Sequence, residues 1–198
     1  MRPLRAALLI AIMQVCSAAT SHAADAVIPP APLFPTAVYE ARREKLMKQL
    51  GGGIAVLYAR GEEDPDGYRQ DSDFYYLTGL NEAGAVLVLS PEERVYKEWL
   101  FLKPRDMDDE RWTGERPSIG DSLRNVTGID RILRTTALGA RMMRLLQTTK
   151  TLQLINDPGG PDAPKAPEKE LYDKLSGRLP GVSVNDRTEL LPAMRSVK

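Results

Sequence analysis

The most constraining feature of the sequence is an unbroken run of apolar, β-prone residues at positions 85–89, Ala-Val-Leu-Val-Leu. Such a run suits a strand, and the lack of polar alternation means that neither face of that strand can be left in water. The run therefore predicts a central strand with other elements packed on both of its faces. Polar, turn-forming segments at 81–84 and 90–94 bound it on either side.

Other strand-like and helix-like segments alternate around this run. We expect strands at 54–58, 74–79, 99–102, 152–155 and 182–184, and helices at 36–50, 118–126 and 168–175, with a further helix that starts at Thr136 or Leu138 and includes Leu146. In the first helix, Thr36 is the expected N-cap, Leu46 and Leu50 belong to the apolar stripe, and Arg43 belongs to the solvated side. The alternation predicts an α/β fold, with a mixed sheet and helices on its faces.

The triple glycine at 51–53 ends the first helix. Glycine triplets can also form phosphate-binding loops, but such loops follow a strand and open a helix. Here the order is reversed, because the triplet follows a helix and opens the strand-like run 54–58. A helix C-cap is therefore favoured over a nucleotide site.

Residues 1–23 have the pattern of a secretory signal peptide. Arg2 and Arg5 precede a short apolar core, and Ser21 and Ala23 provide small residues before a cleavage point. A membrane anchor is the alternative, but the apolar core is shorter than the roughly 20 residues that a spanning helix needs. The proline-rich residues 24–35 are then an extended lead-in, and we expect a secreted or periplasmic protein with no membrane attachment after cleavage.

The loss of this leader would remove several kinds of chemistry. The only His and the only Cys, His22 and Cys16, both lie in it, so the remaining chain would have no disulfide, no Cys nucleophile and no Ser-His-Asp triad. Removing Arg2 and Arg5 from 27 basic residues leaves 25, against 27 acidic residues. This near-neutral charge gives no support to a nucleic-acid or anionic-membrane partner.

Residues 105–116 place a tryptophan among many charged side chains. Four carboxylates lie between positions 106 and 110, but they lack the spacing of an EF-hand loop, so a solvated loop or the first turn of a helix is favoured over a calcium site. Trp112 either pins the core or anchors an interface. We expect it to be partly exposed, because so many neighbouring charges would be costly to bury.

Two blocks of sequence carry a resemblance to a known family. The first is 68–82, Tyr-Arg-Gln-Asp-Ser-Asp-Phe-Tyr-Tyr-Leu-Thr-Gly-Leu-Asn-Glu, and the second is 110–116, Glu-Arg-Trp-Thr-Gly-Glu-Arg. With the run 85–89, an opening helix at 42–46 and a closing segment at 191–198, they resemble the N-terminal domain of aminopeptidase P. These are the Xaa-Pro aminopeptidases of the creatinase and prolidase superfamily. The resemblance assigns residues 36–198 to that domain.

The resemblance implies a mixed, roughly six-stranded sheet flanked by helices, ahead of a catalytic metallopeptidase domain. In that family the catalytic half holds two metal ions, commonly manganese, with two Asp, one His and two Glu, and cleaves the bond before proline. None of these ligands can be placed in this chain, so we expect it to hold no cofactor or metal of its own. The expected partners are its own catalytic domain, further copies of the chain and, through the full enzyme, proline-containing peptides.

The resemblance also indicates which residues matter. Trp112, Gly114 and Arg116 are expected at a substrate cleft or interface, because the corresponding tryptophan of the family approaches the active site of a neighbouring subunit. The first block is expected to be structural, and it contains Arg69, Gln70, Asp71, Ser72, Asp73, Phe74, Tyr76 and Gly79. From the residues alone, an ion pair of Arg69 with Asp71 or Asp73 at the entrance of a buried aromatic strand is favoured over a ligand site.

Three functions from different classes follow. The leading hypothesis is the non-catalytic N-terminal domain of an exported Xaa-Pro metalloaminopeptidase, which shapes the substrate cleft and assembles oligomers. The alternative is a stand-alone module that binds a peptide or protein and has lost the peptidase. A complete enzyme that uses carboxylates alone is the weakest hypothesis, because no paired Asp or Glu stands out on a cleft-forming element.

Overall fold

The computed structural model describes residues 30–61 and 68–196. The predicted signal peptide and the first part of the proline-rich lead-in lie outside these residues. Within the described ranges, no helix has both the length and the apolar character needed to cross a membrane.

A six-stranded mixed sheet forms the centre of the fold, as predicted. Its strands are β1 (Ile54–Tyr58), β2 (Val86–Leu89), β3 (Glu98–Leu102), β4 (Ile132–Arg134), β5 (Thr151–Leu154) and β6 (Ser183–Asp186). They lie in the order β4-β3-β2-β1-β5-β6. The pairs β1–β2 and β2–β3 are antiparallel, whereas β1–β5, β3–β4 and β5–β6 are parallel.

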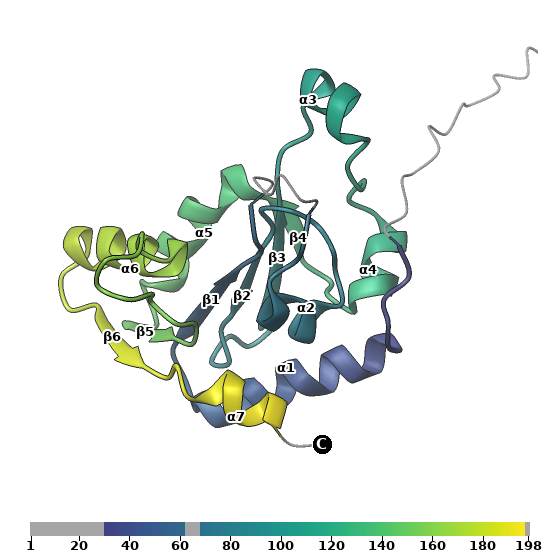
Figure 1. The fold of residues 1–198 in the computed structure, drawn as a ribbon. Helices are drawn as coiled ribbons and strands as arrows, with labels where there is room; N and C mark the ends of the chain where they lie inside the picture. The colour runs from purple at the N-terminus through teal and green to yellow at the C-terminus, as the bar shows by residue number, and fades with distance from the viewer. Residues whose placement is uncertain (1–29, 62–67, 197–198) are drawn as a thin grey trace, which may run out of the picture.

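Helices cover both faces of this sheet (Figure 1). They are α1 (Thr36–Leu50), α2 (Ser72–Thr78), α3 (Met107–Thr113), α4 (Asp121–Thr127), α5 (Leu138–Leu145), α6 (Pro167–Arg178) and α7 (Leu190–Ser196), with a 3-10 turn, Thr135–Ala137, before α5. One core cluster joins α1, α2, α4 and α7 to one face of the sheet. A second cluster joins α5 and α6 to the other face.

The strand β2 has the central position that its apolar run predicts. All four of its residues are buried. Leu87 and Leu89 belong to the core cluster beneath α1, while Val86 and Val88 belong to the cluster beneath α5 and α6. Successive side chains of a strand point to opposite faces, so this strand contributes equally to both halves of the core.

The predicted aromatic strand at 74–79 is wrong, because these residues form the helix α2. Asp71 begins the helix, and its Oδ1 accepts hydrogen bonds from the backbone N–H groups of Asp73 (3.0 Å) and Phe74 (2.8 Å). Gly79 ends it in the left-handed conformation, with φ of 66°. These two caps outweigh the β-propensity of the aromatic residues between them. The expected ion pair of Arg69 is wrong as well, because among the described residues Asp71 caps α2 and Asp73 pairs with Arg195 instead.

Arg43 of α1 is buried, although the sequence predicted a solvated position for it. Its side chain is 0% exposed, its Nε donates to Glu98 Oε2 at 2.9 Å, and its Nη1 donates to the carbonyl of Leu77 at 2.9 Å. Thr36 is also not the N-cap, since Pro35 takes that position and the Thr36 hydroxyl donates to the carbonyl of Asn125 at 2.9 Å. The C-cap at Gly51, with φ of 69°, is as predicted.

Candidate functional site

The second sequence block forms an arm that projects from the body of the fold. The chain leaves the sheet after β3, forms the short helix α3 and returns to α4, and Figure 1 shows α3 standing away from the other elements. Asp106 begins this helix, because its Oδ1 accepts a hydrogen bond from the Asp108 backbone N–H at 2.9 Å. Gly114 ends it, with φ of 87°. The acidic segment is thus the first turn of a helix, one of the two outcomes favoured over a calcium loop.

Trp112 lies on this arm and faces solvent. It is 90% exposed, and Met107 at the start of the same helix is 77% exposed. The tryptophan is therefore even more open than the partial exposure that we expected, and a core-pinning role is wrong for it. A large aromatic side chain in this position is typical of an interface anchor.

One arginine joins the arm to the body and another forms an ion pair within the arm. Arg134, at the end of β4, donates to the carbonyl of Lys103 at 2.8 Å and to the carbonyl of Pro117 at 3.4 Å. It therefore joins the two ends of the arm. Arg105 forms an ion pair with Glu110 at 2.6 Å. Hydrogen bonds from Arg105 hold the pKa of Glu110 below its ordinary value, which keeps this carboxylate charged.

The two sequence blocks meet at the base of the arm. Arg116 is buried and pairs with Glu82 of the first block at 3.4 Å. Gly114 and Arg116 line a cavity of about 290 Å³ together with Tyr68 and Asn81 of the first block. The structure therefore brings Gly114 and Arg116 together with the first block, while Trp112 points away into solvent from the same arm.

Gln70 and Asp71 of the first block organise its backbone. The Gln70 side chain accepts from the backbone N–H groups of Arg60 (3.1 Å) and Asp71 (2.8 Å) and donates to the carbonyls of Leu80 (3.2 Å) and Glu82 (3.1 Å). One amide side chain thus crosslinks both ends of the segment that contains α2. This placement agrees with the structural role that the resemblance implies.

The same block also holds the last described helix, α7. Arg195 donates to Asp73 at 2.6 Å and to the Ser72 hydroxyl at 3.0 Å, and the Tyr76 hydroxyl donates to the carbonyl of Met194 at 3.3 Å. Phe74 contributes to the core, while Arg69 lies exposed before the helix. The motif therefore holds α7 against α2.

Gly79 allows a close approach that no other residue would permit. A Cβ atom at this position would lie 2.6 Å from the ring of Tyr39, and the backbone is in the left-handed region. Tyr39 itself is buried in the core. The glycine is thus required both by the turn and by the packing of α1 against α2.

The structure adds one buried carboxylate that the sequence reasoning missed, Glu168 at the start of α6. Its Oε1 accepts from the Tyr58 backbone N–H at 2.7 Å, and burial raises the pKa of Glu168. The neighbouring Tyr58 is also affected, since burial raises its pKa to about 12. The sequence signal for Glu168 was weak. It follows Pro167 at the start of a helix-like segment, and a Glu in the first turn of a helix is normally solvated, so its burial could not be predicted.

The described residues do not assemble a metal centre. Among residues 30–61 and 68–196, no three or more Asp, Glu, His or Cys side chains are grouped so that they could hold a metal ion. The expectation of a dinuclear manganese site concerns a different domain, and it stays a prediction. What the site presents is an exposed aromatic side chain on an arm whose ends contact charged side chains.

Comparisons with known proteins assign the family. The family described as "Aminopeptidase P, N-terminal domain" matches residues 39–154. Xaa-Pro aminopeptidase 3 of Dictyostelium discoideum is 30% identical over 168 residues, which is 81% of this chain and 31% of that protein. The Xaa-Pro aminopeptidase of Escherichia coli K12 is 34% identical over 116 residues, covering 54% of this chain and 26% of its own length.

A comparison with solved structures supports the same family assignment. Proline aminopeptidase P II from Yersinia pestis matches with a TM-score of 0.64 and 25% identity, over 83% of this chain and 40% of that chain. The sheet, its flanking helices and the arm thus define an N-terminal domain of the kind that precedes a peptidase domain. The chain belongs to the aminopeptidase P N-terminal domain family. It spans about a third or less of the length of these two curated relatives.

Proposed function

We propose that this chain acts as the non-catalytic N-terminal domain of an exported Xaa-Pro metalloaminopeptidase. In this role it shapes the substrate cleft and assembles oligomers of the enzyme that releases an N-terminal residue preceding proline. The observation that carries the proposal is Trp112, which is 90% exposed on an arm that Arg134 holds at both ends. An anchor of this kind is useful only where a second surface covers it.

The fixed position of α7 supports the same proposal. A domain that shapes the cleft of another must be held at a defined angle to it, and the contacts of Arg195 with Ser72 and Asp73 provide such a fixed exit. The metal ions of the reaction would be held by the catalytic domain that the resemblance implies. This chain's contribution would be the positioning of Trp112 against a neighbouring subunit.

Export is part of the proposal, and it has a direct test. The leader 1–23 carries the basic and apolar segments of a signal peptide, with Ala23 at the expected cleavage point. The intact mass of the protein recovered from its own host should correspond to a chain that begins at Ala24. A species that retains Met1 in the membrane fraction would contradict export.

The functional test compares Trp112→Ala with Arg111→Ala in the protein purified from its own host. Arg111 is the matched control because it is the exposed neighbour on the same helix. We expect metal-dependent release of the N-terminal residue from an Xaa-Pro peptide, with turnover or oligomer size lowered by the tryptophan change alone. Residues 24–198 by themselves should release nothing, with or without Mn²⁺.

Two outcomes would overturn the proposal. One is equal behaviour of the two variants in light scattering and in turnover. The other is the absence of any peptidase activity from the native preparation, which would favour a stand-alone module that binds a peptide or protein.

A further inference from the structure

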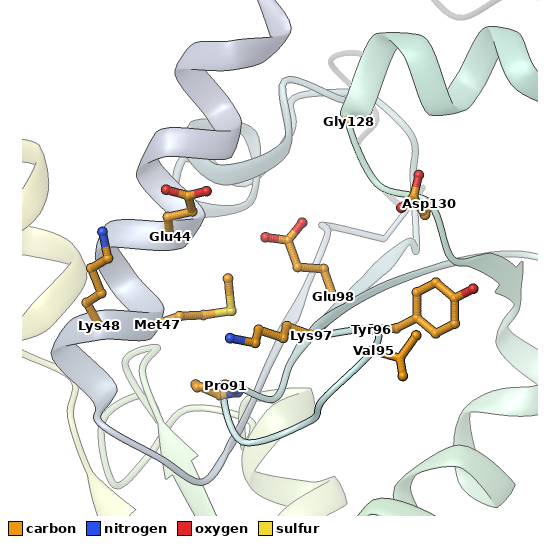
Figure 2. A pocket seen from close by; sticks show the side chains of 10 residues that line it. All are labelled: Glu44, Met47, Lys48, Pro91, Val95, Tyr96, Lys97, Glu98, Gly128 and Asp130. Carbon is orange, nitrogen blue, oxygen red and sulfur yellow. The ribbon is translucent and has the colours of Figure 1, made fainter.

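A second site lies on the side of the fold away from the arm. A cavity of about 610 Å³ opens between α1, the connection from β2 to β3, and the loop that leads from α4 to β4 (Figure 2). Its volume is in the range of pockets that bind small molecules, about 300–1,000 Å³. None of the residues that the two sequence blocks single out lines it.

The inner wall of this cavity presents a carboxylate that cannot swing away. Glu98 is half-buried, and Arg43 donates to its Oε2 at 2.9 Å from the fully buried side behind it. The other oxygen, Oε1, forms no hydrogen bond or ion pair among the described residues, and Figure 2 shows the carboxylate directed into the opening. A fixed, half-desolvated acceptor of this kind favours a cationic hydrogen-bond donor.

Two further carboxylates strengthen the attraction for a cation. Glu44 of α1 and Asp130 of the α4–β4 loop line the same cavity. Burial raises the pKa of Glu98, whereas the charge of Arg43 and its hydrogen bond act in the opposite direction. Three carboxylates thus line this end of the cavity, where Arg43 pairs with Glu98 alone, so an ammonium group placed there would be attracted.

Positive charge lines the cavity as well. Lys48 and Lys97 both border it, and neither ammonium forms an ion pair or a hydrogen bond with any residue in the ranges 30–61 and 68–196. In Figure 2 the Lys97 side chain extends toward Met47, on the other side of the opening from the carboxylate of Glu44. Opposite charges thus border one cavity without pairing with each other, so a ligand that carries both charges would complement them.

Apolar side chains line the cavity as well. Met47 and Tyr96 are partly buried in it, and Val95 is 77% exposed at its edge. Tyr96 is fixed by the guanidinium of Arg131, which lies 3.9 Å from the ring centroid. A flexible thioether and a fixed ring can accept an aliphatic side chain of varied shape.

We propose that this cavity binds a short zwitterionic peptide. The ammonium group of the peptide lies against Glu98 and Glu44, its carboxylate lies against Lys97, and an apolar side chain packs on Met47 and Tyr96. The ammonium could come from the peptide's α-amino group or from a lysine side chain, and the test separates these sources. The proposal concerns binding by this chain alone, so it does not depend on peptidase activity or on Trp112.

Calorimetric titration of residues 24–198 tests the proposal with four probes. They are the tripeptide Ala-Leu-Ala, its N-acetylated form, its C-amidated form, and N-acetylated Ala-Lys-Ala. We expect saturable binding of free Ala-Leu-Ala and a loss of affinity of about tenfold or more when either end is capped. Restoration of binding by N-acetylated Ala-Lys-Ala would show that a side-chain ammonium can serve, and failure to restore it assigns the α-amino group.

The variants assign each charge to its end. Glu44→Gln should weaken the binding of free Ala-Leu-Ala and reduce the loss of affinity that N-acetylation causes. Lys97→Met should instead reduce the loss of affinity that C-amidation causes. Glu98 is left unchanged because its loss would leave Arg43 buried without its partner. The matched controls are Glu170→Gln and Lys174→Met, an exposed pair on α6, and they should bind like the unaltered chain.

The proposal predicts that Trp112→Ala binds the tripeptide normally, which separates it from the function proposed for the arm. It would be overturned by equal binding of free and capped tripeptides. Unchanged affinity in both cavity variants, or the absence of saturable binding at millimolar tripeptide, would overturn it too.

Discussion

Replacing each of the two tryptophans by alanine should lower the stability by very different amounts. Trp112 is 90% exposed, whereas Trp99 of β3 is 2% exposed. A fully buried tryptophan removes up to about 250 Å² from water, so about a tenth of that area is protected at Trp112. At about 25 cal/mol per Å², Trp112→Ala should lower the free energy of unfolding by only ~0.6 kcal/mol.

The same change at Trp99 removes a core side chain and leaves a cavity between β3 and α5. We expect Trp99→Ala to cost roughly 3–5 kcal/mol, which is a large part of the stability of an ordinary domain. Urea unfolding of residues 24–198, followed by circular dichroism, measures both free energies. Tryptophan emission provides the control, because the variant that keeps only Trp99 should emit at shorter wavelength than the variant that keeps only Trp112.

A loss of more than about 2 kcal/mol in Trp112→Ala would refute the reasoning, because a solvated side chain cannot contribute that much to folding. It would mean that the arm packs onto the body. The role of Trp112 as an interface anchor would then lose its physical basis.

Three further changes test the remaining arguments. Asp71→Ala should cost about 1 kcal/mol in urea unfolding because two backbone N–H groups of α2 lose their acceptor, and a loss near zero would contradict the capping role. Gly79→Ala should cost about 1–3 kcal/mol, since its Cβ would meet the Tyr39 ring at 2.6 Å, and an unchanged melting temperature would argue against this clash. Burial raises the pKa of Glu168, so the folded protein binds this proton at a higher pH than the unfolded chain. Stability should therefore fall, relative to Glu168→Gln, as pH rises from about 4.3 through the folded pKa, and parallel urea midpoints against pH would exclude this effect.

The sequence predicted the core of the sheet because the relevant signals are local. The run at β2 indicated burial on both faces, and the positions of α1, β1, β3 and α6 could be read from periodicity and from glycine or proline at their ends. The strand β4 was not predicted, because it has only three residues and pairs in parallel with β3 through non-local hydrogen bonds. Short elements of this kind carry too little pattern to be recognised.

The errors at α2 and Arg43 have different physical causes. The aromatic residues of α2 favour a strand, and the outcome depended on the caps at Asp71 and Gly79, which are present in the sequence but were given too little weight. Arg43 could not have been placed from its own helix. Its burial is possible because Glu98, 55 positions later, supplies a carboxylate, and only the folded structure brings the two together.

The candidate site was also predicted only in part from the sequence. The motifs singled out both blocks, yet they did not show that the first block contacts α7 while the second carries an exposed tryptophan. Arg134 illustrates why, because it belongs to neither block and still joins the two ends of the arm through the carbonyls of Lys103 and Pro117.

The ion pair between Glu82 and Arg116 connects these two roles. Glu82 follows the segment that Gln70 crosslinks, and Arg116 lies at the base of the arm. Gln70 and the caps of α2 order the first block through hydrogen bonds, and the pair of Glu82 with Arg116 connects that block to the base of the arm. The block that contacts α7 and the block that presents Trp112 are therefore joined directly, so a partner that contacts both would meet them in a defined relative orientation.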